Sequence, residues 1–254
     1  MSGIAGSEVA RRASAFVVAH GNVEQRARAA ALFDATSRTA LGGLLGPIDS
    51  DAAALSVLAR FDAAGVHGGP AVERAVARLC AAQEPDGGWS CAPMLDRAAA
   101  AAYIAGLLAK TAFARPSVLA AAGRLVAQSW APERVEGGAA EAIAAYACFF
   151  SNFDHELSDA ALQWCGRELE RGFRSGAIGA VAVGRVFALC DAQALPGARL
   201  SADEVALSIA AALAEDGGIL ASDADTGVRV ETTLTALEAL RRLTPRAFCD
   251  PSLP

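Results

Sequence analysis

The stretch Gln83–Trp89, QEPDGGW, interrupts a chain that is otherwise rich in helix-forming residues. Proline lacks the backbone N–H that a helix interior needs, and glycine readily adopts the backbone conformations of a sharp reversal. A weaker copy, AEDGGIL, occupies Ala214–Leu220 near the C-terminus. We therefore expect a tight turn between two helices at each stretch, with Trp89 packed over the end of a helical hairpin.

Breaks that contain glycine recur along the chain at intervals of about 44 residues, enough for two helices and their connections. They lie at Gly42–Gly43, Gly87–Gly88, Gly137–Gly138, Ser175–Gly176 and Gly217–Gly218. A regular period of this length is typical of proteins assembled from repeated helical hairpins.

Two kinds of predicted helix alternate between these breaks. Helices that are apolar on nearly every side begin near Ala52, Ala98, Ala139 and Ala177, and a more polar one begins near Val228. Helices with a charged stripe begin near Pro70, Pro116, Leu157 and Ser201, and Glu8–Ala19 and Val23–Phe33 supply one more pair. A helix that is apolar all round needs cover on both sides, whereas a striped helix faces water on one. The alternation predicts an inner and an outer layer.

These layers predict an all-α fold, an α/α toroid of about six helical hairpins with an inner apolar ring and an outer amphipathic ring. An open helical solenoid has a similar period, but it would leave a face of each apolar helix exposed. We expect one domain over residues 1–254, with irregular tails at 1–6 and 245–254.

Composition restricts the kind of protein and its partners. Hydrophobic residues make up 54% and charged residues 20% of the chain, which is typical of an ordered globular protein. A net charge of −6 disfavours nucleic acid as a partner. The longest apolar run, Ala98–Ala109, is shorter than the roughly 20 residues of a membrane span. Neither a secretory signal nor a C-x-x-C pair is visible, so we expect a cytoplasmic protein with reduced cysteines.

The QEPDGGW stretch also resembles a known repeat. Gln83, Gly87 and Trp89 have the spacing of the Q-x-x-x-G-x-W motif of squalene–hopene and oxidosqualene cyclases, and DGGW is similar to a turn of protein prenyltransferase β subunits. Glu215–Ile219, EDGGI, is a degraded second copy. The resemblance implies the terpenoid cyclase and prenyltransferase superfamily of toroids, and hence a central cavity that binds an isoprenoid or another apolar small molecule.

Two D-x-D pairs directly precede predicted inner helices: Asp49 with Asp51, and Asp223 with Asp225. Resemblance to class II terpene cyclases implies that Asp225 or Asp51 donates a proton in an acid-initiated cyclisation or isomerisation, with Asp223 and Asp49 as neighbours. Protonating an alkene needs a carboxylic acid that is kept neutral in a dry cavity, and neighbouring carboxylates favour that state. The alternative is that these residues cap helices, where a negative charge gains about 0.3–1 kcal/mol.

Aromatic residues are the candidates for contact with substrate. Those on predicted inner helices, together with the turn tryptophan, are Phe16, Phe61, Tyr103, Tyr146, Phe149, Phe150, Phe187 and Trp89. Such rings line apolar cavities and stabilise a carbocation by about 0.5–2 kcal/mol each, and ordinary core packing is the alternative. The aromatic content of 6% disfavours large polyene substrates.

The sequence contains no motif for a metal or cofactor site. The zinc site of prenyltransferases needs a D-x-C with a later histidine, which is missing, so no metal or cofactor is expected unless a diphosphate substrate brings Mg²⁺. Class II cyclases form their site between two helical domains, so the resemblance implies a homodimer or a partner subunit that closes the barrel mouth. The alternative function is a non-catalytic toroid that binds a lipid or a protein partner through one rim.

Overall fold

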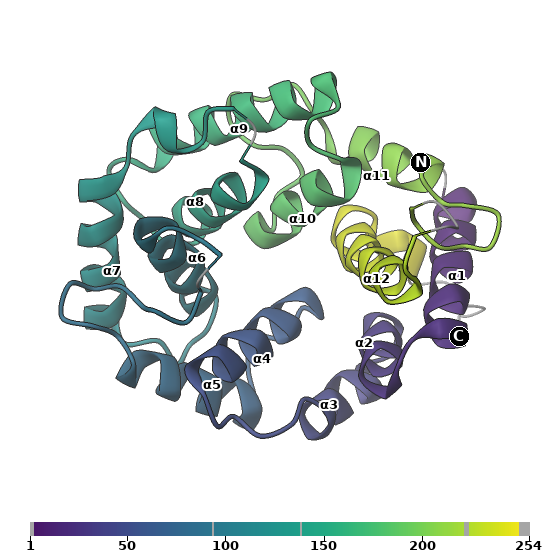
Figure 1. Cartoon of the computed structure of the whole chain (residues 1–254), viewed down its shortest axis with the longest axis horizontal. Helices are drawn as coiled ribbons and strands as arrows, with labels where there is room; N and C mark the ends of the chain where they lie inside the picture. The colour runs from purple at the N-terminus through teal and green to yellow at the C-terminus, as the bar shows by residue number, and fades with distance from the viewer. Residues whose placement is uncertain (1–2, 93, 138, 221–223, 249–254) are drawn as a thin grey trace. The chain divides into compact units, whose positions relative to one another are not determined.

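The computed structural model describes residues 3–92, 94–137, 139–220 and 224–248 (Figure 1). Within these ranges the protein has twelve α-helices, two short 3-10 helices and no strand, which confirms the predicted all-α fold. Contacts divide the chain into two compact units, and the single domain over residues 1–254 stays a prediction. Unit 1 comprises Met1–Gly46, Gly179–Ala194 and Leu200–Pro254, and unit 2 comprises Pro47–Ile178 and Leu195–Arg199.

Unit 2 consists of three helical hairpins in two layers. Its helices are α4 (Asp51–Ala63), α5 (Pro70–Ala81), α6 (Arg97–Ala109), α7 (Pro116–Ser129), α8 (Ala140–Asn152) and α9 (Ser158–Ser175), with η1 (Pro132–Arg134) before α8. Each of α4, α6 and α8 pairs with the helix that follows it, and α6 also packs against α4 and α8 (Figure 1). The helices α4, α6 and α8 therefore form one layer, which we call the apolar layer, and α5, α7 and α9 cover it.

The sequence pattern explains this layering. Every residue of Ala98–Ala102 in α6 is buried, as expected for a helix covered on several sides. Gly106 lets α6 approach α8 closely, because a Cβ there would lie 2.8 Å from the backbone nitrogen of Phe149. In contrast, α9 exposes Arg167 and Arg171 on one side, as predicted for a striped helix.

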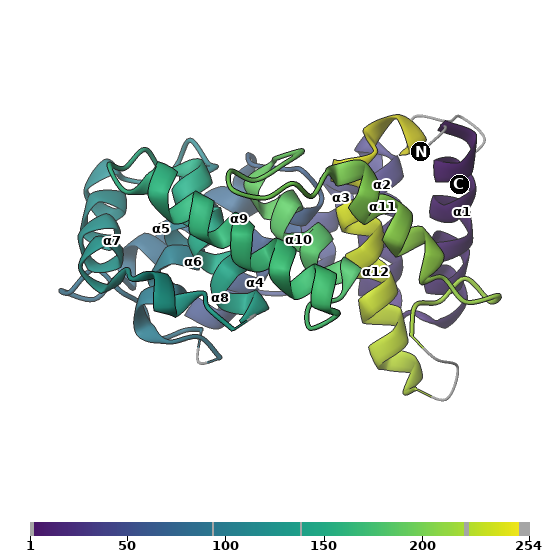
Figure 2. The ribbon, with the colours of Figure 1, turned by 90° about the horizontal axis from the view of Figure 1, so that it is seen from above.

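Unit 1 is organised around one long helix. Its elements are α1 (Gly3–His20), α2 (Val23–Phe33), α3 (Ala35–Leu44), α10 (Ala180–Cys190), α11 (Ala202–Ala211), α12 (Thr226–Leu243) and η2 (Pro245–Phe248). Helix α12 contacts α1, α2, α10 and α11 (Figure 2). Arg28 of α2 bonds Glu231 at 2.6 Å and Glu238 at 2.9 Å, both on α12. The last predicted inner helix is thus the core of this unit.

Both chain ends are more helical than predicted. Helix α1 begins at Gly3, inside the segment 1–6 that was expected to be irregular, and η2 lies inside the expected tail 245–254. None of the described helices combines the length and the hydropathy that a membrane crossing requires.

Helix α3 was not predicted, because its C-terminal part contains the Gly42–Gly43 break. Glycine in a helix costs only about 1 kcal/mol relative to alanine, so it weakens a helix without excluding it. The start of α3 is fixed by Asp34, whose side chain accepts a hydrogen bond of 2.6 Å from the Ser37 N–H.

Candidate functional site

The QEPDGGW stretch folds as a tight turn between α5 and α6, as predicted. The Gly87 N–H donates to the Glu84 carbonyl and the Glu84 N–H donates to the Gly88 carbonyl, each at 2.9 Å. Gly87 has a φ of +93°, and a Cβ there would lie 2.4 Å from the carbonyl oxygen of Ala121 in α7. Only glycine satisfies both the backbone conformation and the approach of α7.

Charged and aromatic side chains hold the turn in place. Arg97, the first residue of α6, donates to Glu84 at 2.7 Å and to Asp86 at 2.9 Å. These hydrogen bonds lower the pKa of both carboxyl groups. The Trp89 indole N–H donates to the Leu79 carbonyl at 2.7 Å, and the side chain is 2% exposed. The motif therefore joins the end of α5 to the start of α6.

The second copy forms the same turn in unit 1. The Ala214 N–H donates to the Gly218 carbonyl at 2.9 Å, and the Gly217 N–H donates to the Ala214 carbonyl at 3.0 Å. Asp216 accepts from the Gly218 N–H at 2.9 Å, as Asp86 does in the first copy, and from Arg229 of α12 at 2.8 Å. The two stretches are thus structural repeats despite their weak sequence similarity.

Helix α1 covers the second turn as α7 covers the first. A Cβ on Gly217 would lie 2.4 Å from the Arg12 carbonyl oxygen. The Arg12 guanidinium donates to the carbonyl of Ala214 at 2.8 Å, and Arg229 lies 4.7 Å from the ring centre of Phe16. The first helix of the chain therefore packs on the last long one as a neighbouring repeat would.

The predicted acids have the contacts of residues at helix starts. Asp225 is exposed and caps α12, accepting a hydrogen bond of 3.1 Å from the Val228 N–H. Asp51 is the first residue of α4, 41% exposed, and accepts from Arg78 at 2.7 Å. Asp49 is exposed as well. Asp225 thus caps its helix as in the capping alternative, but the N-cap of α4 is Ser50, which accepts from the Ala53 N–H at 3.1 Å. The proton-donor role stays a prediction.

The remaining predicted acid, Asp223, lies outside the described residues. Nothing structural can therefore be said of it or of its pairing with Asp225, and its part in the D-x-D hypothesis also stays a prediction.

Three of the predicted substrate-contacting aromatics lie between the layers of unit 2. The ring of Trp130, which follows α7, is 4.9 Å from Tyr146 and 5.6 Å from Phe150, centre to centre. A Cβ on Gly123 of α7 would lie 3.7 Å from the ring of Phe149. Packing between helices is thus a sufficient account of these rings.

Among the other aromatic candidates only Tyr103 is partly exposed, and the buried ones are Phe16, Phe61, Phe187 and Trp89. Tyr146 is completely buried, and among the described residues its hydroxyl has no hydrogen-bond partner. Burial, followed by the nearby charge of Asp96, raises the pKa of Tyr146 to about 12. Contact of these rings with a ligand stays a prediction.

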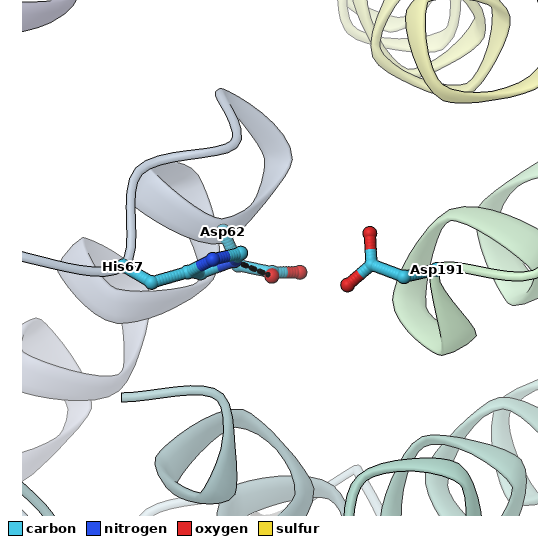
Figure 3. Close-up of side chains that lie close together, drawn as sticks. All are labelled: Asp62, His67 and Asp191. Atoms are coloured by element: carbon cyan, nitrogen blue, oxygen red, sulfur yellow. Dashed lines mark hydrogen bonds and ion pairs between the residues drawn. The ribbon is translucent and has the colours of Figure 1, made fainter. Parts of the chain in front are cut away.

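The apolar layer contains an ionic cluster that the sequence did not reveal. Asp62 lies in the last turn of α4, Lys110 directly follows α6, and their side chains are 6% and 3% exposed. The Oδ1 atom of Asp62 accepts a hydrogen bond of 2.9 Å from Lys110 Nζ. Nε2 of His67 lies at hydrogen-bond distance, 2.9 Å, from the same oxygen (Figure 3). We call Asp62, His67 and Lys110 the Asp62 triad.

The sequence carries only a weak signal for this triad. Asp62 interrupts an otherwise apolar helix face, and His67 stands in a short loop between Gly65 and Gly69, both with positive φ. The sequence predicts that His67 lies near the end of a helix. Its partner Asp62 also pairs with Lys110, which lies 48 residues further along the chain. The packing of α4 against α6 brings Lys110 to Asp62, whereas His67 lies only five residues after Asp62 in the chain.

Comparisons with models of known families, with curated protein sequences and with solved structures found no match for this chain. A functional proposal therefore depends on the chain's own residues and contacts. The likeness of Gln83–Trp89 to the cyclase repeat remains a resemblance, to which the structure adds the geometry of the turn.

Proposed function

We propose that the chain is an α/α toroid related to terpenoid cyclases and prenyltransferases, and that it binds an isoprenoid or a similarly apolar small molecule. The observation that carries the proposal is the role of each motif residue. The Gln83 side chain donates to the Gly87 carbonyl at 3.0 Å, Gly87 admits the next helix, and Trp89 anchors the preceding one. Each of the three motif residues has a structural task in this turn, which supports the resemblance to the repeat.

Two further features support a ring of hairpins. In unit 2, an apolar layer is covered by a layer of striped helices, as the toroid requires. In unit 1, α1 packs on α12 and contacts the second turn as a neighbouring repeat would.

The placement of the D-x-D residues favours binding without acid-initiated chemistry. A carboxylic acid that protonates an alkene is kept neutral by a dry, apolar environment. Asp225 and Asp49 are exposed, and Asp51 accepts a hydrogen bond from a guanidinium. These acids stabilise helix starts in our proposal, and the non-catalytic alternative, in which a lipid is the bound molecule, is the second candidate.

The test is a panel of isoprenoid alcohols, ketones, hydrocarbons and diphosphates of monoterpene to triterpene size. Binding is measured by the shift of the thermal unfolding midpoint, and products by mass spectrometry. We expect at least one member to raise the midpoint, and Asp225→Ala to bind it equally well while losing about 0.5–2 kcal/mol of stability through the cap. A panel without any shift would remove the proposal.

The same variant tests whether Asp225 acts only as a helix cap. If a hydrocarbon is cyclised by the wild type and recovered unchanged with Asp225→Ala, Asp225 is the proton donor, and both the capping role and the non-catalytic candidate fail. Asp96→Ala is a matched control, because Asp96 caps α6 through a 2.9 Å bond to the Ala99 N–H and belongs to no D-x-D pair.

A further inference from the structure

The arginine of the first turn has an acceptor for every nitrogen of its guanidinium. Arg97 donates to Asp86 from both Nε and Nη2. Its Nη2 also donates to Glu84 at 2.7 Å, and its Nη1 donates to the Ser90 hydroxyl at 3.4 Å. The first turn therefore leaves no nitrogen of this guanidinium for a ligand.

The arginine of the second turn is only partly paired. Within the described residues, Arg229 has one hydrogen-bond acceptor, Asp216, which Nη2 reaches at 2.8 Å. The Arg229 side chain is 7% exposed, its Nε is buried without a partner, and its guanidinium carbon lies 4.7 Å from the centre of the Phe16 ring. An arginine side chain is always charged in proteins. Buried donors of this kind have lost water without gaining an acceptor, which is unfavourable unless a ligand supplies one.

Two substitutions account for the difference between the turns. Alignment of the two D-G-G stretches places Ala214 at the position of Glu84. It places Leu220 at the position of Ser90. Neither replacement can accept a hydrogen bond with its side chain. The second turn thus lacks the acceptor of Nη1 and one of the two acceptors of Nη2.

A second guanidinium adds positive charge to the same turn. Arg12 of α1 donates from Nη2 to the carbonyls of Ala214 at 2.8 Å and Glu215 at 3.1 Å. In the first turn, the covering helix presents Ala121 at the equivalent contact. The Glu215 side chain is exposed, where water and salt screen its charge. The second turn has therefore lost a bound carboxylate and gained an arginine, which favours an anion from outside the chain.

We infer that Arg229 binds the carboxylate group of a small molecule, at a site that is separate from the proposed isoprenoid function. The first turn identifies the class of ligand, because the carboxylate of Glu84 fills the same place there. A guanidinium binds a carboxylate through two parallel N–H···O bonds, here from Nη1 and Nη2 of Arg229. Leu220, which is 43% exposed, favours a carboxylate that carries an apolar chain. All the residues of this site belong to unit 1.

The probe is hexanoate, and hexanol is the matched compound that lacks the carboxylate. Binding to the full-length protein at low salt is measured by the shift of the thermal unfolding midpoint, followed by circular dichroism. We expect hexanoate to raise the midpoint of the wild type and hexanol to leave it unchanged. Arg229→Gln should need about 10- to 100-fold more hexanoate for the same shift, because it loses hydrogen bonds from a charged donor. Arg97→Gln is the matched control and should bind hexanoate as the wild type does, because Arg97 has no free nitrogen.

A second variant, Ala214→Glu, keeps the test decisive if Arg229→Gln does not fold. It restores the carboxylate of the first turn beside Arg229, so it should raise the midpoint without ligand and abolish the hexanoate shift. The inference is overturned if Ala214→Glu does not raise the midpoint, or if the hexanoate shift persists in this variant or in folded Arg229→Gln. A wild type that responds to inorganic phosphate but not to hexanoate also overturns it, as does one that responds to neither. The isoprenoid panel tests the proposed function separately.

Discussion

Replacement of Gly87 by alanine tests the turn that defines the repeat. A residue other than glycine pays about 1–2 kcal/mol for a left-handed backbone conformation, and Gly87 has a φ of +93°. The added Cβ would also lie 2.4 Å from the oxygen and 2.6 Å from the carbon of the Ala121 carbonyl. These are backbone atoms within α7, which cannot rotate away, and overpacking of this kind costs about 1–3 kcal/mol. Together the two effects predict a loss of about 2–5 kcal/mol.

Gly137→Ala is the matched control in the same unit. Gly137 has a φ of +80°, but a Cβ there would meet no atom within 4 Å, so only the conformational cost applies. The three tryptophans, Trp89, Trp130 and Trp164, all lie in unit 2, and their fluorescence during urea unfolding reports its stability. We expect Gly87→Ala to be less stable than Gly137→Ala by about 1–3 kcal/mol. Equal losses would refute the close approach of α7.

Three further variants test individual contacts. Arg97 lowers the pKa of Asp86, so the stability that this contact contributes is present above the ordinary carboxyl pKa of about 4 and is lost on acidification. Arg97→Gln removes the contact. The urea midpoint followed by fluorescence should then depend less on pH between about 6 and 3. Tyr146→Phe removes a buried hydroxyl without a partner among the described residues, and urea unfolding should show a gain of about 1–3 kcal/mol. Burial raises the pKa of Glu238, although Arg28 opposes the shift. Ionisation of Glu238 therefore lowers the stability of the fold as pH rises above about 4. Glu238→Gln should abolish this loss of stability, measured by unfolding followed by circular dichroism.

The helices could be predicted from the sequence because their signals are local. Pro70 and Pro116 occupy the first positions of α5 and α7, as expected for residues that fit a first helical turn, and Ser201 caps α11. Helix α3 was missed because two glycines in its last turns have the same composition as a break. Local propensity favours a turn there, whereas the Asp34 cap and the contact of α3 with α2 favour a helix.

The candidate site was harder to predict, because its contacts join distant segments. A D-x-D pair before a helix is visible in the sequence, but a capping residue and a proton donor have the same local pattern, and only exposure distinguishes them. The converse holds for Asp62, which has no motif around it and becomes notable through its burial beside Lys110. The contacts of the aromatic residues were equally hard to predict. The sequence places Tyr146 on an apolar helix but does not show which residue its ring contacts.

A comparison of the two copies of the turn shows which residues both copies share and which belong to the first copy alone. Ile219 stands where Trp89 does and cannot donate from its side chain, and the Ile219 N–H instead donates to the Thr233 hydroxyl at 2.9 Å. Both copies keep the acid, the two glycines and an arginine from the following helix, 11 residues after Asp86 and 13 after Asp216. In each copy the aspartate accepts hydrogen bonds from the N–H of the second glycine and from the arginine, so these three residues form one hydrogen-bonded network. D-G-G followed by an arginine in the next helix is therefore a better signature of this turn than the glutamine and tryptophan, which the second copy lacks.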